Sequence, residues 1–204
     1  MSKLLHINTS VRSNGSISRQ MTNEFLQKWQ ASHAGDTVTT LDLASHPVPH
    51  LTEQMMGAFF TPAEQRNAEQ AHTIAVSDRL VAQLKEADVL VIGSPMYNFG
   101  ISSTLKAWID HVARAGVTFQ YTANGPVGLL QGKKVYVFTS RGGVYSQGPA
   151  TAMDFQESYL RAVLGFLGIS DITFIHSEGV AMGEEAAAKA IAGSRQTIGE
   201  LLAA

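Results

Sequence analysis

Val89-Leu90-Val91-Ile92 decides the fold class of this chain, because it is a run of apolar residues rich in β-branched side chains. Such a run is typical of a strand that is buried on both faces, as in a parallel sheet between two layers of helices. Val135-Tyr136-Val137-Phe138-Thr139 is a second run of this kind. Together they predict the centre of a parallel sheet.

Shorter apolar segments extend the predicted sheet to five strands: Leu4–Ile7, Val38–Leu43 and Ile172–Ile175. Helices are expected over residues 18–30, 62–86, 103–115 and 150–167 and after Gly183. Ser18 is the predicted N-cap of the first helix, and Thr61-Pro62-Ala63-Glu64 predicts a capping box for the second. The proline-containing segment from His46 to Thr61 is expected to be a long loop.

Strands that alternate with helices predict an α/β fold, namely a doubly wound five-stranded parallel sheet with helices on both faces. The chain has 204 residues, which fits one domain over residues 1–204.

The composition narrows the function classes. A net charge of −2, from 15 basic and 17 acidic residues, offers no basic face for nucleic acid. There is no apolar run of about 18 residues, as a transmembrane helix requires, and the N-terminus lacks a signal-peptide pattern, so no membrane partner and a cytoplasmic location are expected. The absence of cysteine excludes disulfides and thiolate chemistry.

In open parallel sheets, ligands bind beyond the carboxyl ends of the strands, where the strand order reverses. The loop after the first strand contains Ser10, Ser16 and Ser18 and leads into a helix, whose N-terminal N–H groups favour anions. Arg12 and Arg19 are expected to add positive charge. Neither a dinucleotide glycine fingerprint nor a P-loop is present, so the loop suits the phosphate monoester of a mononucleotide such as FMN. A solvated loop in which Ser18 only caps the helix is the alternative.

The loops after the third and fourth strands have the residues that a flat heteroaromatic ring requires. Met96-Tyr97-Asn98-Phe99 combines apolar walls with one amide, and Gly142-Gly143 lets the backbone approach a ligand closely. Ordinary core packing and a plain turn are the alternatives for these two segments. Arg141 either contacts the ligand or forms a surface ion pair.

Taken together, these loops resemble those of the FMN-dependent NADH azoreductases, within the flavodoxin-like quinone reductase superfamily. Ser102 departs from the pattern, since many members have Pro there, but Ser is also a good N-cap. The segments that carry the resemblance are Pro95-Met96-Tyr97-Asn98-Phe99-Gly100-Ile101, Leu105-Lys106-Ala107-Trp108-Ile109-Asp110, Arg114-Ala115-Gly116-Val117-Thr118-Phe119, Gly125-Pro126 and Ser140-Arg141-Gly142-Gly143.

The resemblance implies a homodimer with one FMN per subunit at the dimer interface, and transfer of two electrons from NADH to azo compounds or quinones. No side chain is expected to act as a catalytic acid or base, because flavin N5 carries the chemistry. The implied cofactor-binding residues are Ser10, Ser16, Ile17, Ser18, Met96, Tyr97, Asn98, Phe99, Ser140, Arg141, Gly142 and Gly143.

The substrate pocket is expected to contain Phe59, Phe60, Phe119 and Tyr121, which are apolar side chains in predicted loops. A soluble monomer rarely exposes such side chains as one large patch, which also favours a dimer with the cleft at its interface. NADH and the acceptor are expected to bind in turn at one open flavin face, which is a ping-pong scheme.

Other functions are less well supported. A flavodoxin-type electron carrier is the main alternative, but carriers usually present an acidic face to their partners and the charges here are nearly balanced. No metal site is expected, since prolines beside His46 and His50 exclude a regular helix. A hydrolase would need a Gly-x-Ser-x-Gly elbow, which is absent. His176 is expected to be structural or at the surface.

Overall fold

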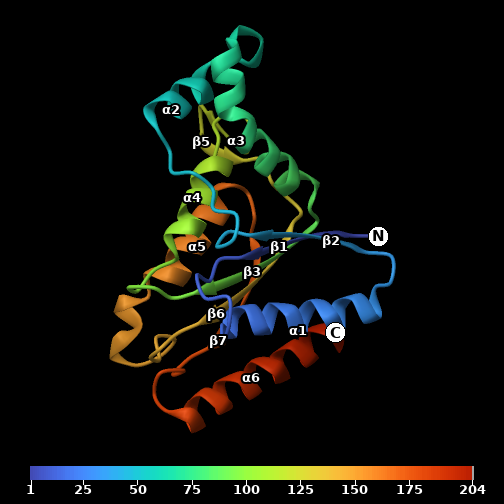
Figure 1. Cartoon of the computed structure of the whole chain (residues 1–204), viewed down its shortest axis with the longest axis vertical. Coiled ribbons are helices and arrows are strands. Elements are labelled where there is room, and N and C mark those ends of the chain that lie inside the picture. Colours follow the sequence, from blue (N-terminus) through green and yellow to red (C-terminus); the bar gives the residue numbers. More distant parts are fainter. Residues whose placement is uncertain (204) are drawn as a thin grey trace.

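Five parallel strands form the central sheet: β1 (Lys3–Asn8), β2 (Thr37–Asp42), β3 (Val89–Pro95), β6 (Lys134–Ser140) and β7 (Asp171–Ser177). Their order across the sheet is β2-β1-β3-β6-β7 in this computed structural model (Figure 1). The structure describes residues 1–203, and Ala204 lies outside the described part. The predicted five-stranded parallel sheet is confirmed.

Helices cover both faces of the sheet. On one face lie α1 (Ile17–Ser32) and α6 (Glu184–Ala203), which run side by side (Figure 1). On the other face lie α3 (Ala68–Glu86), α4 (Ser103–Val112) and α5 (Phe155–Phe166). No helix within residues 1–203 is long and apolar enough to cross a membrane.

The side chains of β3 explain why helices cover both faces. Leu90 and Ile92 belong to the core beneath α3, α4 and α5, whereas Val89 and Val91 belong to the core beneath α1 and α6. Burial of such a side chain contributes about 1.5–3 kcal/mol relative to exposure. A strand that is apolar at every position is therefore most stable between two helical layers.

The segment before α3 differs from the prediction. The predicted loop contains a helix, α2 (Glu53–Phe60), which is capped by Thr52. The predicted capping box at Thr61 is wrong, because the Thr61 hydroxyl donates to the Gly57 carbonyl at the end of α2. A single 3₁₀ turn, η1 (Ala63–Gln65), follows, and α3 begins after Asn67, which forms the capping box with Gln70.

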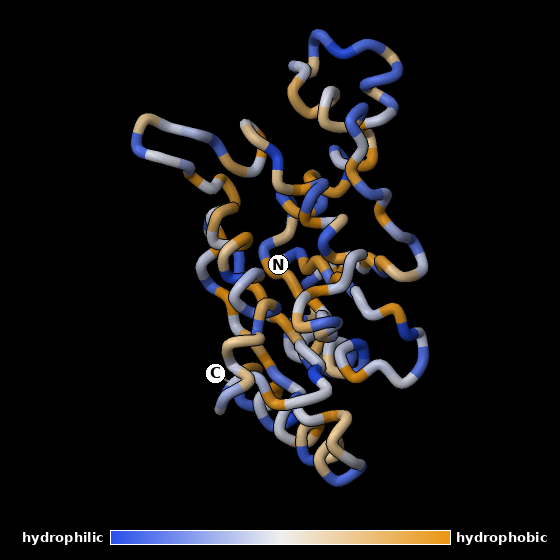
Figure 2. Tube along the Cα trace, turned by 90° about the vertical axis from the view of Figure 1, so that its left-hand side faces the viewer, coloured by the Kyte–Doolittle hydropathy of each residue, from blue (hydrophilic) through white to orange (hydrophobic). Residues whose placement is uncertain are grey.

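A two-stranded antiparallel hairpin, β4 (Phe119–Thr122) with β5 (Gly125–Gly128), was not predicted from the sequence. Figure 2 shows it projecting from the body of the molecule. Its first strand follows closely after α4, which ends three residues earlier than expected. Thr118 accounts for that end, because its hydroxyl donates to the Val112 carbonyl (2.6 Å) and accepts from the Arg114 N–H (2.9 Å).

The helix expected over residues 150–167 is divided. A 3₁₀ turn, η2 (Pro149–Met153), precedes α5, which starts at Phe155. Asp154 separates them, since its carboxylate accepts hydrogen bonds from the backbone N–H groups of Gln156 and Glu157 and so caps α5.

Candidate functional site

The loops after β1, β3 and β6 meet in one cavity of about 160 Å³ at the carboxyl edge of the sheet. The strand order reverses at β1, so the loops after β1 and β3 flank the position where open α/β sheets bind ligands. Most of the predicted cofactor-binding residues line this cavity, which is named the nucleotide cavity after the ligand that the sequence predicts. Its lining is Ser10, Arg12, Gly15, Ser16, Ile17, Pro95, Met96, Tyr97, Ser140, Gly142 and Val180.

The N-terminus of α1 opens into the nucleotide cavity. Ser16 is its N-cap and accepts a hydrogen bond from the Arg19 N–H (3.4 Å), so the prediction of Ser18 as the cap is wrong. Ser18 lies within the first turn, is fully buried, and has its Oγ 3.3 Å from Ser16 Oγ. The first intrahelical bond runs from the Gln20 N–H to the Ser16 carbonyl. The N–H groups of Ile17 and Ser18 therefore precede the helical ladder, as in an anion site.

The positive charges near this loop differ in their surroundings. Arg19 donates two hydrogen bonds of 2.7 Å to Asp42 and one of 2.8 Å to the Ser10 carbonyl. The Arg19 guanidinium holds the pKa of Asp42 far below its usual range. Arg19 thus anchors the loop, and the Asp42 carboxylate offsets its charge. The expectation that Arg19 adds positive charge to the site is therefore wrong. Arg12 is exposed and is the cation in the lining of the nucleotide cavity.

The loop after β3 folds back in a tight turn. Tyr97 and Gly100 exchange two backbone hydrogen bonds of 3.0 Å. Between them, Asn98 and Phe99 have positive φ angles of 49° and 69°. Asn adopts this region readily but Phe does not, and a non-glycine residue held there costs about 1–3 kcal/mol. Phe99 is 43% exposed, so burial of its ring does not explain the strain, which points to a functional position.

Tyr97 joins the loops after β1 and β3. Its hydroxyl accepts a hydrogen bond from the Val11 N–H (3.3 Å) and lies 3.4 Å from Ser10 Oγ. From Tyr97 and Asn98 a wider groove of about 1010 Å³ continues along α4 and α5. The lining of this groove is Val11, Tyr97, Asn98, Gly100, Ile101, Ser103, Lys106, Phe155, Ser158 and Tyr159.

The backbone of the loop after β6 is clamped by the segment that follows β7. The Arg141 N–H donates to the Ser177 carbonyl (2.9 Å), and the Arg141 carbonyl accepts from the Val180 N–H (3.1 Å). The Gly142 carbonyl accepts from the Ala181 N–H (3.1 Å). These bonds give Ser140 to Gly143 a fixed course past the nucleotide cavity.

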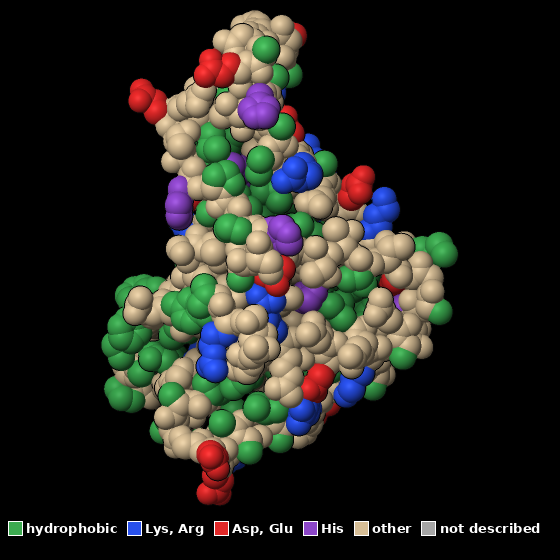
Figure 3. Space-filling model, viewed as in Figure 1, with side chains coloured by type: hydrophobic (Ala, Val, Ile, Leu, Met, Phe, Trp, Pro, Cys, Tyr) green, Lys and Arg blue, Asp and Glu red, His purple; other side chains and the backbone are tan. Residues whose placement is uncertain are grey.

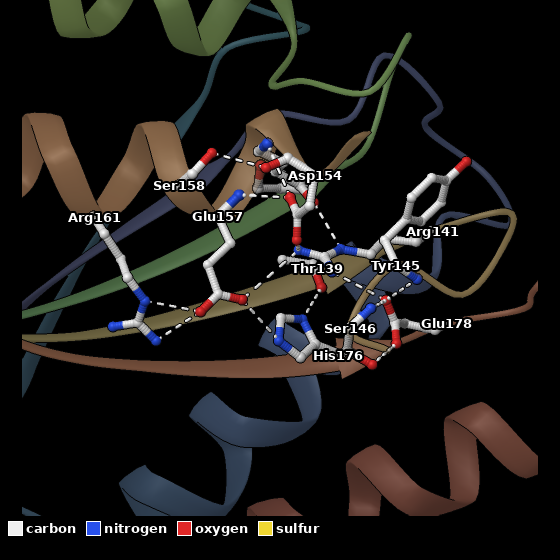
Figure 4. Close-up of polar contacts among 12 residues, drawn as sticks. Thr139, Arg141, Tyr145, Ser146, Asp154, Glu157, Ser158, Arg161, His176 and Glu178 are labelled. Carbon is white, nitrogen blue, oxygen red and sulfur yellow. Dashed lines mark hydrogen bonds and ion pairs between the residues drawn. The ribbon is translucent and has the colours of Figure 1, made fainter. Parts of the chain in front are cut away.

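The side chain of Arg141 is fully buried, which excludes the surface ion pair considered from the sequence. It lies among acidic side chains from α5 and from the segment after β7 (Figure 4). Nη1 donates to Glu178 Oε1 (3.0 Å), and Nη2 forms an ion pair with Asp154 Oδ2 (2.9 Å). Although burial opposes it, hydrogen bonds from Ser146, Tyr145 and Arg141 lower the pKa of Glu178.

His176 is a structural residue of the same cluster rather than a member of the cavity lining. Its Nδ1 lies 2.8 Å from Thr139 Oγ1, and its Nε2 lies 3.0 Å from Glu157 Oε2 (Figure 4). Burial lowers the pKa of His176, and the charge of Arg141 lowers it further. The neutral imidazole thus links β6 to α5.

The four predicted substrate-pocket residues, Phe59, Phe60, Phe119 and Tyr121, line one separate pocket of about 280 Å³. The last turn of α4, at Asp110, lines this aromatic pocket, whereas Ser103 and Lys106, in the first half of the helix, line the groove described above. An ion pair between Lys106 and Asp110 joins the borders of the groove and the pocket. The aromatic pocket shares no lining residue with the nucleotide cavity.

Apolar side chains gather on the surface beside the loops after β3 and β6. Figure 3 shows hydrophobic atoms concentrated where Figure 1 draws η2 and the start of α5. Met153, Phe155 and Met182 are 42%, 62% and 66% exposed. A contiguous apolar surface of this kind marks an interaction or ligand site.

Comparison with known families identifies the chain. A family model described as having a flavodoxin-like fold matches residues 2–202. The chain belongs to this flavodoxin-like family. The family and fold expected from the sequence are thereby confirmed, and the match extends over the β1 loop, the strained turn and the Arg141 cluster alike.

Curated relatives within this family carry one name. "FMN-dependent NADH:quinone oxidoreductase" from Herminiimonas arsenicoxydans is 62% identical, with all of both chains aligned. A protein of the same name from Azotobacter vinelandii is 50% identical over 98% of this chain and 100% of its own.

Solved structures agree in fold. An azoreductase from Bacillus anthracis str. Sterne has a TM-score of 0.91 at 32% identity and covers 99% of both chains. An FMN-dependent NADH-azoreductase from Bacillus anthracis str. Ames Ancestor, solved in complex with FMN, has a TM-score of 0.87 at 28% identity over 99% of this chain and 100% of that one.

Several residues around the site were not singled out from the sequence. Gln156 is fully buried and donates to the Ser94 carbonyl (2.9 Å) at the end of β3. Glu178 and Asp154 hold Arg141, and Val180 lines the nucleotide cavity. The position of Glu178 and Val180 just after the last strand was the available signal, since that loop also lies at the carboxyl edge of the sheet.

Proposed function

We propose that this protein is an FMN-dependent NADH:quinone oxidoreductase that also reduces azo compounds, formed by one FMN-binding domain over residues 1–204. The observation that carries the proposal is the meeting of the loops after β1, β3 and β6 in one cavity at the switch point of the sheet. The names of relatives that are 62% and 50% identical over nearly the whole chain support it.

The first part of the proposal concerns the FMN phosphate. Ser10, Ser16 and Ser18 would hold it with their hydroxyls, together with the backbone N–H groups at the start of α1. The N–H groups of Ile17 and Ser18 have no intrahelical partner, and Arg12 is the cation beside them, so this donor set fits a phosphate monoester.

The second part concerns the ring. Met96 to Phe99 would form its walls, and the backbone from Ser140 to Gly143 would approach its polar edge. Arg141 would contribute through its main chain, because its side chain is fully buried and paired. When bound, FMN supplies the two-electron redox chemistry that no side chain of the chain provides. The protein's contribution is to bind, orient and shield the ring.

A homodimer completes the proposal. The groove lies along the first half of α4 and the aromatic pocket at its end, and the two share no lining residue, so one chain would not surround a ring with both. Phe60 and Tyr121 are 72% and 74% exposed, and they would cover the groove of a second copy. NADH and the quinone or azo acceptor would then use the remaining opening in turn. NADH is a cytoplasmic reductant, which favours a cytoplasmic location.

The test is direct. The purified protein should show the visible spectrum of bound flavin, release FMN rather than FAD on heating, and oxidise NADH with a quinone as the only other reactant. An electron carrier of the flavodoxin type would oxidise no NADH without a protein partner. Release of FAD, or the absence of bound flavin after incubation with FMN, would contradict the proposal.

A further inference from the structure

Arg141 lies between two residues of the nucleotide cavity without lining it. Ser140 and Gly142 both line the cavity, whereas the Arg141 guanidinium points into the protein and is fully buried. Its Nε donates to Gln156 Oε1 (3.0 Å), its Nη1 donates to Glu178 Oε1 (3.0 Å), and its Nη2 lies 2.9 Å from Asp154 Oδ2 (Figure 4). The guanidinium fork thus connects the end of β6 to the start of α5 and to the segment after β7.

The start of α5, which receives Arg141, also holds the strained turn after β3. The Phe155 N–H donates to the Phe99 carbonyl (3.1 Å). Gln156 uses its oxygen for Arg141 and its Nε2 for the Ser94 carbonyl (2.9 Å) and the Ser94 hydroxyl (3.2 Å). A continuous chain of bonds therefore runs from one predicted ring loop to the other through Gln156.

Glu178 extends this connection along the loop after β6. Its Oε1 accepts from the backbone N–H groups of Tyr145 (2.9 Å) and Ser146 (3.0 Å) as well as from Arg141, and its Oε2 accepts from the Ser146 hydroxyl. The ring of Tyr145 meets the ring of Phe99 edge to face, with centroids 6.2 Å apart. The two ring loops thus also touch through these two rings.

The charges around Arg141 argue against a role as an anion ligand. Asp154 and Glu178 lie within 3.0 Å of its nitrogens, and Glu157 lies at 3.9 Å. Glu157 is shared with Arg161 on the exposed side of α5. Carboxylates therefore offset the Arg141 charge, and Arg141 is not among the residues that line the cavity where a phosphate is proposed.

We propose that Arg141 is a positioning residue that sets the spacing of the two flavin-ring loops, without touching the phosphate or the ring with its side chain. This inference rests on the proposed function, since it needs FMN in the nucleotide cavity. Lysine keeps the charge but has no planar fork, so it does not bridge Gln156, Asp154 and Glu178 at once. Arg141→Lys should therefore loosen the ring loops and leave the phosphate loop intact.

The experiment compares two ligands that differ only in the phosphate. Dissociation constants of FMN and riboflavin are measured by flavin fluorescence with the full-length apoprotein. Arg141→Lys should weaken both ligands by the same factor, at least tenfold, so that the ratio of the two constants stays that of the wild type. It should also change the visible circular dichroism of the flavin at saturation, which a merely stabilising residue would not. Arg161→Lys, in the same ion-pair network but exposed, is the matched control. It should leave both dissociation constants and the flavin dichroism as in the wild type.

Gln156→Met is the second variant, since it cuts the connection to Ser94 and leaves the Arg141 ion pairs in place. Gln156→Met should also weaken FMN and riboflavin by one common factor, smaller than the factor for Arg141→Lys, and should change the flavin dichroism. It replaces Arg141→Lys in the test if circular dichroism shows that Arg141→Lys is unfolded. Selective loss of FMN affinity in Arg141→Lys would mean that Arg141 binds phosphate, and would overturn the inference. The inference would also be overturned if both variants kept wild-type affinities for FMN and riboflavin and an unchanged flavin dichroism. Failure of the wild type to bind either flavin would overturn the proposed function itself.

Discussion

The nucleotide cavity and the aromatic pocket are built in different ways. The nucleotide cavity is made by loops that leave adjacent strands of one sheet, and a network of buried hydrogen bonds ties those loops together. The aromatic pocket is made by α2, the end of α4 and the β4–β5 hairpin, and its lining includes no residue of the five sheet strands. Two of its rings, Phe60 and Tyr121, remain largely exposed.

This difference separates two tasks. A cofactor that stays bound needs donors held at fixed positions, and strand ends provide them because the sheet fixes their spacing. Acceptors of varied shape need apolar surface that can adapt, and peripheral helices and hairpins provide it. We therefore expect changes in the first region to act on FMN affinity and changes in the second to act on acceptor kinetics.

The largest effect is expected from the double variant Ser16→Ala, Ser18→Ala. Each lost hydrogen bond to a charged phosphate costs about 1.5–3 kcal/mol, so FMN affinity should fall by about two orders of magnitude or more. Fluorescence titration of the apoprotein measures it. Ser13→Ala, an exposed position of the same loop, is the control and should keep wild-type affinity. An unchanged affinity of the double variant would show that these serines serve only to start α1.

A second effect concerns the sheet that supports the first region. Burial, aided by the charge of Arg19, lowers the pKa of His6 on β1 to about 4. The unfolded chain takes up this proton first as the pH falls, so the unfolding free energy should decline between the ordinary histidine pKa of 6.5 and about 4, by up to about 3 kcal/mol. Urea unfolding at pH 7.5 and pH 4.5, followed by circular dichroism, tests this.

His6→Gln should remove most of that pH dependence, whatever its effect at neutral pH. His72→Gln, at an exposed position of α3, should behave as the wild type. Parallel pH profiles for the wild type and His6→Gln would refute the assignment of the acid limb to this histidine.

A smaller effect is expected in the second region. Phe60→Ala and Tyr121→Ala should each lower kcat/KM for a quinone by about tenfold, which corresponds to about 1.4 kcal/mol of lost apolar contact. The FMN dissociation constant should stay within a factor of about two, and sedimentation should show weakened dimers. Val127→Ala, exposed on the same hairpin but outside the pocket, is the matched control. If FMN affinity fell by the same factor as kcat/KM, the two regions would not serve separate tasks.

The smallest effect is a factor of two in stoichiometry. If donor and acceptor use one opening in turn, double-reciprocal plots at several acceptor concentrations should be parallel. Two NADH should be consumed for each azo bond cleaved and one for each quinone, because full cleavage to two amines takes four electrons. Intersecting lines would show that both substrates bind at once.

The sheet and the meeting of its loops were predictable because burial on both faces leaves a plain record in the sequence. Val89 to Ile92 are apolar at each position, and the carboxyl ends of parallel strands share one edge. The meeting of the loops after β1, β3 and β6 follows from that edge alone. Seven of the eleven residues that line the nucleotide cavity were predicted as cofactor-binding residues, whereas Gly15, Pro95 and Val180 were not and Arg12 was expected only as a nearby charge. The predicted residues that do not line it are Ser18, Asn98, Phe99, Arg141 and Gly143.

The peripheral elements were not predictable in the same way. The β4–β5 hairpin is short and largely exposed, so it has no apolar periodicity, although Asn124-Gly125 is a known hairpin signal. The prolines before α2 obscured an eight-residue helix. Arginine is rarely buried, and the partners of Arg141 come from separate segments, so nothing local indicates its network.

Selection for thermal stability would favour substitutions in the Tyr97–Gly100 turn. Phe99→Gly would let position 99 adopt its φ of 69° without steric cost, and such strain-relieving changes are easily found in stability screens. The same change would delete a half-exposed ring beside the groove. Directed evolution scored on Tm alone would thus enrich more stable proteins with slower turnover. Libraries built on this scaffold should therefore hold position 99 constant.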